Sequence, residues 1–206
     1  MRLIPLSGGH VHELLTAATA DRSTFAFTPV PGDEASMVEY VASACRKREA
    51  GEHIPFVTFS KVHRRIVGST RFYDLTPWMW EGPFAGPGGR QRVDRPDVAT
   101  IGYTWLEPAA QRSPVNTEAK VLMLDHAFDT WDVYAVRIQT DARNQRSRAA
   151  IERLGFTLDG VIRADKPGAD GTVRDSATFS MLAEEWPVHR SRLATRLAWH
   201  TQEGFL

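Results

Sequence analysis

Apolar and polar residues follow one another along the chain in short segments whose periods indicate strands and helices. Apolar runs rich in β-branched and aromatic residues predict strands at residues 3–7, 54–60, 65–75, 98–106 and 135–142. Residues 157–182 predict two further long strands, because Pro-Gly and Asp-Gly pairs interrupt a strand-like pattern. Helical patterns predict the remaining elements, at residues 8–19, 31–51, 113–131, 143–156 and 187–200.

The order of these elements is β-α-α-β-β-β-α-β-α-β-β-α. Strands alternate with helices in the second half, which favours parallel pairing there, whereas the hairpins favour antiparallel pairing elsewhere. A chain of 206 residues suits a single domain. We therefore expect an α/β protein with one mixed, twisted sheet of about seven strands and helices on both faces.

The helix expected at 113–131 begins in a way that suits two different roles. Ser113 is a good N-cap and Pro114 fits the first helical position, so the segment is a sound start for a core helix. A helix start also presents unpaired N–H groups and partial positive charge, which suit a bound diphosphate. One apolar face anchors the helix, formed by Val121, Leu124, Phe128 and Trp131.

Residues 76–97 interrupt the pattern with a long segment rich in proline and glycine. A loop of this length inside a compact domain is usually functional or disordered. Trp78 and Trp80 make its first half too apolar for a simple solvated linker. The two tryptophans suit the wall of an acceptor pocket, and the alternatives are packing over a sheet edge or a contact between two copies in a homodimer.

Composition narrows the classes of function. Lys and Arg number 25, as do Asp and Glu, so no overall charge attracts nucleic acid or an anionic membrane. Cys45 is the single cysteine, which excludes an intramolecular disulfide and favours a reducing compartment. We expect a cytoplasmic protein, since neither a signal-peptide pattern nor a membrane-length apolar run occurs. His10 and His12 lack further zinc ligands at suitable spacing, so no metal is expected.

Two stretches, "IGYTWLEPAAQRSPVNTEAKVLMLDHAF" and "TDARNQRSRAAIERLGF", resemble the GCN5-related N-acetyltransferase (GNAT) superfamily. Within it, the chain looks like the branch whose enzymes acetylate ribosomal-protein N-termini. The resemblance implies a GNAT-like domain over 1–186 and a C-terminal helical extension over 187–206. It also implies that strands 98–106 and 135–142 splay apart, so that the pantetheine arm of acetyl-CoA inserts between them.

The resemblance assigns acetyl-CoA, without a metal, to a set of residues in the strand, the loop, the helix start and the following helix. These residues are Tyr103, Thr104, Trp105, Leu106, Gln111, Arg112, Ser113, Pro114, Val115, Asn116, Thr117, Asn144 and Ser147. Pro114 and Asn116 stand where the superfamily usually has glycines. Proline removes one N–H donor, so phosphate binding is expected to rely more on Arg112 and the helix dipole.

The resemblance also implies candidates for the catalytic residues. Ser147 is expected to protonate the departing CoA thiolate, with Asn144 beside it on the pantetheine. From the residues alone, Asn144 is simply a helix cap and Ser147 belongs to the first turn. Many relatives carry a glutamate base where Thr100 stands here. Asp97, Glu107 and a water chain remain as candidates, and Asp97 is our expected base.

The expected function is transfer of an acetyl group from acetyl-CoA to a primary amine in a ternary complex. A protein N-terminus is the first candidate acceptor and a small-molecule amine the second, with Arg71, Tyr73, Trp78 and Trp80 around it. A larger donor such as succinyl-CoA is an alternative. A non-catalytic acyl-CoA-binding module is another, motivated by Thr100.

Overall fold

The computed structural model describes residues 1–78 and 95–202, with side chains as far as Trp199. Within these residues, seven strands form one sheet in the order β1-β2-β3-β4-β5-β7-β6. The strands are β1 (Arg2–Pro5), β2 (Ile54–Ser60), β3 (Arg65–Thr76), β4 (Val98–Leu106), β5 (Ala135–Asp141), β6 (Thr157–Pro167) and β7 (Val173–Leu182). The mixed seven-stranded sheet predicted from the sequence is confirmed.

The helices follow the predicted order as well. They are α1 (Val11–Thr19), α2 (Glu34–Glu49), α3 (Val115–Asp125), α4 (Gln145–Leu154) and α5 (Trp186–Gln202). Short 3-10 turns lie at Gly8–His10, Ser23–Phe25 and Pro108–Ala110, and α3 continues as a π-helical turn over His126–Thr130. None of the described helices is both long and apolar enough to cross a membrane.

The strands β4 and β5 run parallel but stay paired for only part of their length. Their pairing extends from Val98 opposite Ala135 to Ile101 opposite Ile138. Beyond that point β4 continues to Leu106 and β5 to Asp141 without pairing to each other. The predicted splay of these two strands is therefore confirmed, and it leaves part of both strand edges open to a ligand.

A β-bulge distorts β4 at the start of this splay. Ser69 pairs with Trp105 and Arg71 with Gly102, so two residues of β4 lie opposite one of β3. Tyr103, within the bulge, has φ 51°, a left-handed conformation that is unusual for a residue with a side chain. Bulges often occur beside active sites because they redirect side chains and end regular pairing.

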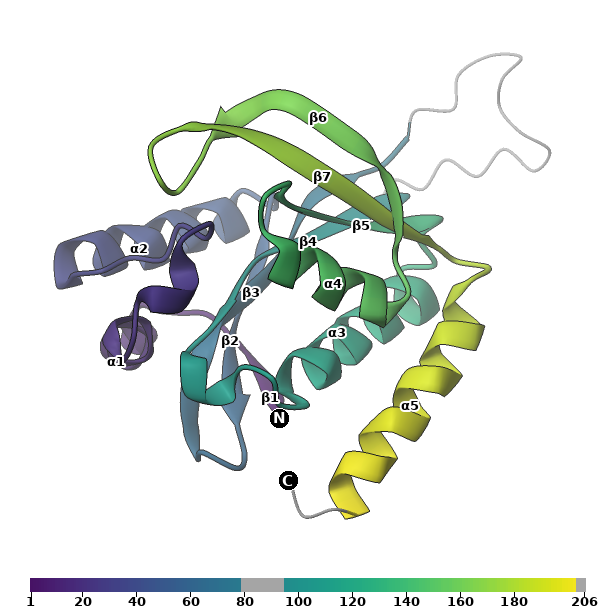
Figure 1. Cartoon of the computed structure of the whole chain (residues 1–206), viewed down its shortest axis with the longest axis horizontal. Helices are drawn as coiled ribbons and strands as arrows, with labels where there is room; N and C mark the ends of the chain where they lie inside the picture. Colours follow the sequence, from purple (N-terminus) through teal and green to yellow (C-terminus); the bar gives the residue numbers. More distant parts are fainter. Residues whose placement is uncertain (79–94, 203–206) are drawn as a thin grey trace.

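Helices cover both faces of the sheet, as predicted (Figure 1). On one side, α1 and α2 pack Leu14, Met37 and Val41 against the first strands. On the other side, α3 and α5 belong to the main core, which also receives residues of α4. Trp186 and Leu193 are almost completely buried in that core, so the first half of the C-terminal helix packs on the domain.

Candidate active site

A cavity of about 820 Å³ opens where β4 and β5 separate. Residues of β3, the loop after β4, α3, α4, α5 and the β6–β7 hairpin also line it. The structure brings together here most of the residues that the resemblance assigned to acetyl-CoA: Tyr103, Thr104, Trp105, Leu106, Gln111, Arg112, Ser113, Pro114, Asn116, Thr117, Asn144 and Ser147. Val115 is buried instead in a small apolar cluster under the loop.

The loop before α3 is held in a defined shape. The side chain of Gln111 donates to the carbonyl of Leu106 at 2.8 Å, which ties the loop to the end of β4. Arg112 has φ 59°, a left-handed conformation more usual for glycine. Ser113 Oγ donates to the carbonyl of Ala110 at 2.6 Å and accepts the N–H of Val115 at 3.3 Å. Helix α3 begins one residue later than expected, with Pro114 at the cap position.

The start of α4 presents its two predicted residues to the same cavity. Asn144 caps the helix by accepting the N–H of Ser147 at 3.0 Å, and Gly155 ends the helix with φ 108°. Asn144 is buried, and both side chains line the cavity. The capping role derived from the residues is confirmed, and the same placement is compatible with contacts to a ligand.

The charge of the cavity differs from that of the whole chain. Its cationic lining residues are Arg112, Lys120, Arg146, Arg153, Lys166, Arg174 and Arg196. Among the described residues no Asp, Glu or His lines it. A concave site whose charged lining residues are all cationic attracts polyanions. The cavity therefore has this property even though the chain as a whole carries no net charge. Nowhere in the described part of the chain do three or more His, Cys, Asp or Glu side chains lie close enough together to hold a metal ion.

Lys120 is a site residue that the sequence interpretation missed. It lies on α3, lines the cavity and is 3% exposed. Its amine donates to the hydroxyls of Thr70 and Thr104 at 3.2 and 2.9 Å. Burial lowers the pKa of this amine to about 7. Its place on the buried face of α3, three residues before Met123, is the sequence signal for it, since a core face rarely carries lysine.

The bulge side of the cavity is aromatic. Tyr73 and Tyr103 line it with ring centroids 5.4 Å apart, and burial raises the pKa of Tyr73 well above its ordinary range. Arg71 lies behind Tyr103, with its guanidinium carbon 3.9 Å from the Tyr103 ring centroid, and is itself buried. Two of the expected acceptor residues, Arg71 and Tyr73, are thus close together, although only Tyr73 reaches the cavity lining.

Other expected site residues lie elsewhere. Asp97 precedes β4, at the end of that strand opposite the splay, and its carboxylate accepts the N–H of Trp78 at 2.6 Å. Trp78 stacks on Tyr134, with ring centroids 5.3 Å apart. Neither residue lines the cavity, so the structure does not bring the expected base Asp97 to the other site residues. Trp80 lies outside the described residues.

Comparison with known proteins identifies the family. The sequence profile described as Acetyltransferase (GNAT) domain matches residues 1–157, which is well over half of the chain. The chain belongs to the GNAT family.

Individual relatives agree with this assignment. YdaF of Bacillus subtilis (strain 168), a provisionally assigned ribosomal N-acetyltransferase, is 28% identical over 109 residues. That match spans 52% of this chain and only 58% of YdaF. A GCN5-related N-acetyltransferase from Brucella melitensis has a TM-score of 0.77 at 24% identity, covering 94% of this chain and 80% of that one. RimJ from Mycobacterium smegmatis, in complex with CoA-disulfide, has a TM-score of 0.72 at 21% identity, covering 94% and 88%.

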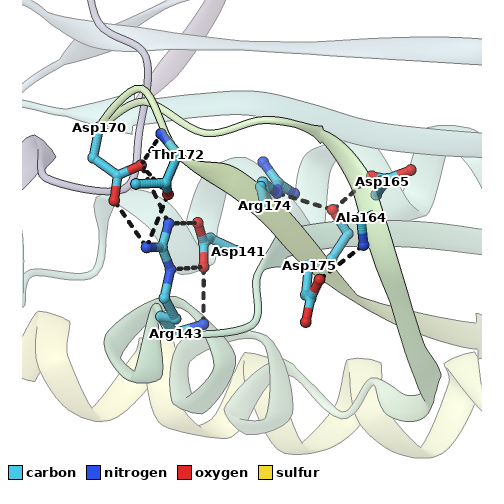
Figure 2. A network of polar contacts seen from close by, with 9 residues as sticks. Asp141, Arg143, Ala164, Asp165, Asp170, Thr172, Arg174 and Asp175 are labelled. Atoms are coloured by element: carbon cyan, nitrogen blue, oxygen red, sulfur yellow. Dashed lines mark hydrogen bonds and ion pairs between the residues drawn. The ribbon is translucent and has the colours of Figure 1, made fainter.

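In this GNAT domain, the turn of the β6–β7 hairpin is tied to the start of α4 (Figure 2). Arg143 donates to both carboxylate oxygens of Asp141, at 3.0 and 2.8 Å. It also donates to Asp170 at 2.8 Å and to Thr172 at 3.2 Å. The hydrogen bonds of Arg143 lower the pKa of both carboxyl groups. These contacts cross-link the connection between β5 and α4 to the hairpin turn.

A second group of contacts shapes the hairpin itself. Ala164 has φ 49°, and its N–H donates to the carboxylate of Asp175 at 2.8 Å. Ser176 accepts from Arg174 at 2.9 Å and donates to Asp165 at 2.6 Å. These bonds stabilise a register shift in β6, so that Arg174 is fixed where it lines the cavity.

Arg143→Ala is expected to loosen the hairpin turn without unfolding the GNAT domain. The substitution removes the cross-link and leaves the buried Asp141 carboxylate with fewer donors. Amide hydrogen exchange at residues 168–172 should rise at least about tenfold at pH 7. Arg46→Ala, which breaks an exposed pair with Glu39 on α2, is the matched control. Unchanged exchange in the turn would show that the cross-link does not hold the hairpin.

Proposed function

We propose that this protein transfers an acetyl group from acetyl-CoA to a primary amine. The observation that carries the proposal is the cavity itself, which enters the splay between β4 and β5 and is lined by cations without acids among the described residues. An acetyl-CoA molecule supplies an activated acetyl group on a long arm attached to a strongly anionic diphosphate. The cavity combines an open strand edge for such an arm with positive charge for such a head group.

Several groups fit the proposed co-substrate. Arg112, beside the N-terminus of α3, and Arg146, near the N-terminus of α4, suit the diphosphate. The backbone from Tyr103 to Leu106 is not paired with β5 and is therefore available to the amides of pantetheine. RimJ of Mycobacterium smegmatis, which shares the fold, was solved with CoA-disulfide, and this supports a CoA site in the present chain.

The proposed catalytic contribution of the chain has two parts. A backbone N–H near Trp105 or Leu106 polarises the thioester oxygen, as preorganised donors do in acyl transfer. Ser147, at the first turn of α4, protonates the departing thiolate. Trp105 and Leu106 on β4 and Ser147 on α4 are all among the residues that line the cavity, which supports this assignment.

A protein N-terminus is the proposed acceptor. Its α-amine has a pKa of about 8, against about 10.4 for a lysine side chain, so it loses its proton more readily. The name of YdaF points to ribosomal protein, which supports an amine on a polypeptide. Tyr73 and Tyr103 would contact the acceptor, with Arg71 behind them.

This reaction belongs to the cytoplasm, where acetyl-CoA and new protein N-termini occur together. A contact of Trp78 and Trp80 with the acceptor or with a second copy remains a prediction.

CoA thiol release tests this function directly. Purified protein is incubated with acetyl-CoA and, in separate reactions, N-terminal peptides, the same peptides blocked at the α-amine, and small primary amines. We expect thiol release that requires a free α-amine, together with saturable acetyl-CoA binding. Tight binding without amine-dependent release would favour a non-catalytic acyl-CoA-binding module. Faster release with succinyl-CoA would indicate a different donor.

Ser147→Ala is expected to lower kcat by about 10²-fold or more, because general acid catalysis typically contributes that much. Acetyl-CoA binding should change little, since the hydroxyl acts on the departing sulfur. The control is Ser191→Ala on the exposed face of α5, which should keep wild-type turnover. A Ser147→Ala protein with wild-type kcat would exclude Ser147 as the proton donor.

A further inference from the structure

The proposed reaction needs a proton acceptor, and the cavity narrows the choice. Among the described residues, its lining includes no carboxylate and no imidazole. Arginine does not deprotonate in proteins, and the raised pKa of Tyr73 keeps its hydroxyl protonated. Of the two lining lysines, Lys166 is exposed and paired with Asp165 at 3.0 Å. Lys120 is therefore the lining group whose properties differ most from those of an ordinary surface cation.

The surroundings of Lys120 favour a neutral amine. Its side chain is almost completely buried, and its hydrogen-bond partners are the hydroxyls of Thr70 and Thr104. These hydroxyls lie 2.8 Å apart, next to the bulge. No carboxylate within the described part of the chain forms a salt bridge with Lys120. A buried ammonium without a carboxylate is costly, and amines in such sites lose their proton far more readily than in water.

The charged side chains of the described cavity lining offer Lys120 no counter-ion. Every element beside Lys120 that contributes a charged side chain to the lining contributes a cation: Arg112 from the loop, Arg146 and Arg153 from α4, Lys166 and Arg174 from the hairpin, and Arg196 from α5. Glu118, on α3 itself, pairs with the amino group of Met1 and does not line the cavity. Burial is the cause that lowers the pKa of Lys120 to about 7, so the amine is substantially neutral at physiological pH.

We propose that Lys120 is the catalytic residue that takes the proton from the attacking amine. The proposal rests on the acetyltransferase function proposed above. Tyr73 and Tyr103 at the bulge and Lys120 on α3 line the same cavity, so an amine entering at the bulge lies in the cavity that Lys120 lines. Thr70 and Thr104 fix the position of the Lys120 Nζ beside the strand proposed to hold pantetheine.

The step balances without any further reactant. The ammonium form of the acceptor first passes one proton to the neutral Nζ of Lys120. The neutral amine nitrogen then forms a bond to the acetyl carbon and releases its second proton to solvent. The carbon–sulfur bond then breaks, the sulfur keeps the electron pair, and Ser147 supplies its proton. Lys120 returns its proton through solvent, and the serine oxygen is reprotonated in the same way. An amine of low pKa suits this base, which favours an α-amine over a lysine side chain as acceptor.

Two substitutions separate a base from a cation that only binds anions. Lys120→Met keeps the approximate size of the side chain and removes the amine, whereas Lys120→Arg keeps the charge and cannot accept a proton at neutral pH. We expect both to lower kcat/KM for an N-terminal peptide by about 10²-fold or more at pH 7. Acetyl-CoA affinity of Lys120→Met, measured by calorimetry, should stay within a few-fold of wild type. Lys61→Met, exposed in the β2–β3 turn, is the matched control.

The pH dependence gives a result that a structural role would not produce. Between pH 7 and 9.5 an α-amine becomes neutral without help, so the deficit of Lys120→Met should shrink about tenfold. Three results would each overturn the role of Lys120 while leaving the proposed function intact. They are a deficit of Lys120→Met that does not change with pH, turnover retained by Lys120→Arg, and a loss confined to acetyl-CoA affinity. Wild-type protein that acetylates no amine would overturn both.

Discussion

Gly68→Ala is expected to destabilise the fold by about 3 kcal/mol and to weaken acetyl-CoA binding. Gly68 lies on β3 opposite Leu106, where the two strands approach closely behind the bulge. A Cβ atom at this position would lie 2.0 Å from the carbonyl oxygen of Trp105 and 2.9 Å from its carbonyl carbon. Both atoms are backbone, so only a shift of the strand relieves the contact. That strand is the one proposed to hold pantetheine.

Urea unfolding and calorimetric titration with acetyl-CoA measure the two effects. Gly160→Ala is the matched control, because Gly160 also lies in a strand and a Cβ there meets no atom within 4 Å. We expect Gly160→Ala to keep both stability and affinity. If Gly68→Ala matched the control in both measurements, the close approach of β3 and β4 would not be a requirement of the site.

Lys120→Met is expected to stabilise the protein by about 2–4 kcal/mol at pH 7. The pKa of the Lys120 amine is about 7 in the fold, against an ordinary value of 10.5, and each unit of difference corresponds to about 1.4 kcal/mol. The lost hydrogen bonds to Thr70 and Thr104 offset part of that gain. A residue that lowers the stability of the fold and yet lines a cavity is typical of a functional site.

The sign of the pH dependence follows from proton binding. Between about pH 7 and 10.5 the unfolded chain holds a proton on Lys120 that the folded chain does not, so wild-type stability rises with pH relative to Lys120→Met. Below pH 7 both states are protonated and the penalty is constant. The stability gap between the two proteins should therefore be widest near and below neutral pH and close toward pH 10. A gap independent of pH would show that the amine is not perturbed.

Much of the fold is predictable from local patterns. The periods of apolar residues differ between strands and helices, and the turn residues between them are distinct, so the order of elements was correct throughout. The cap at Asn144 and the stop at Gly155 follow from local chemistry and were confirmed. Local signals also placed the start of α3 to within one residue, although Pro114 rather than Ser113 is at the cap position.

The site depends on contacts between distant segments, which local patterns do not contain. Burial lowers the pKa of Lys120, and one of its buried hydrogen-bond partners is the hydroxyl of Thr70, 50 residues earlier in the chain. Asp97 was the expected base because Thr100 stands where many relatives carry a glutamate, and Trp78 was an expected acceptor residue because it belongs to a long apolar loop. The splay lies at the other end of β4, so both residues are outside the cavity. Arg143 connects the hairpin turn to the start of α4 through Asp170, 27 residues later in the chain.

The central claim is that the cavity between β4 and β5 binds acetyl-CoA and delivers its acetyl group to an amine. The most direct measurement uses acetyl-CoA labelled with carbon-13 in the acetyl group and an N-terminal peptide, with mass spectrometric sequencing of the product. We predict that the label appears on the peptide α-amine with wild-type protein and is strongly reduced with Ser147→Ala. Labelled acetyl-CoA that binds tightly but is recovered intact, with every tested amine unmodified, would contradict the account.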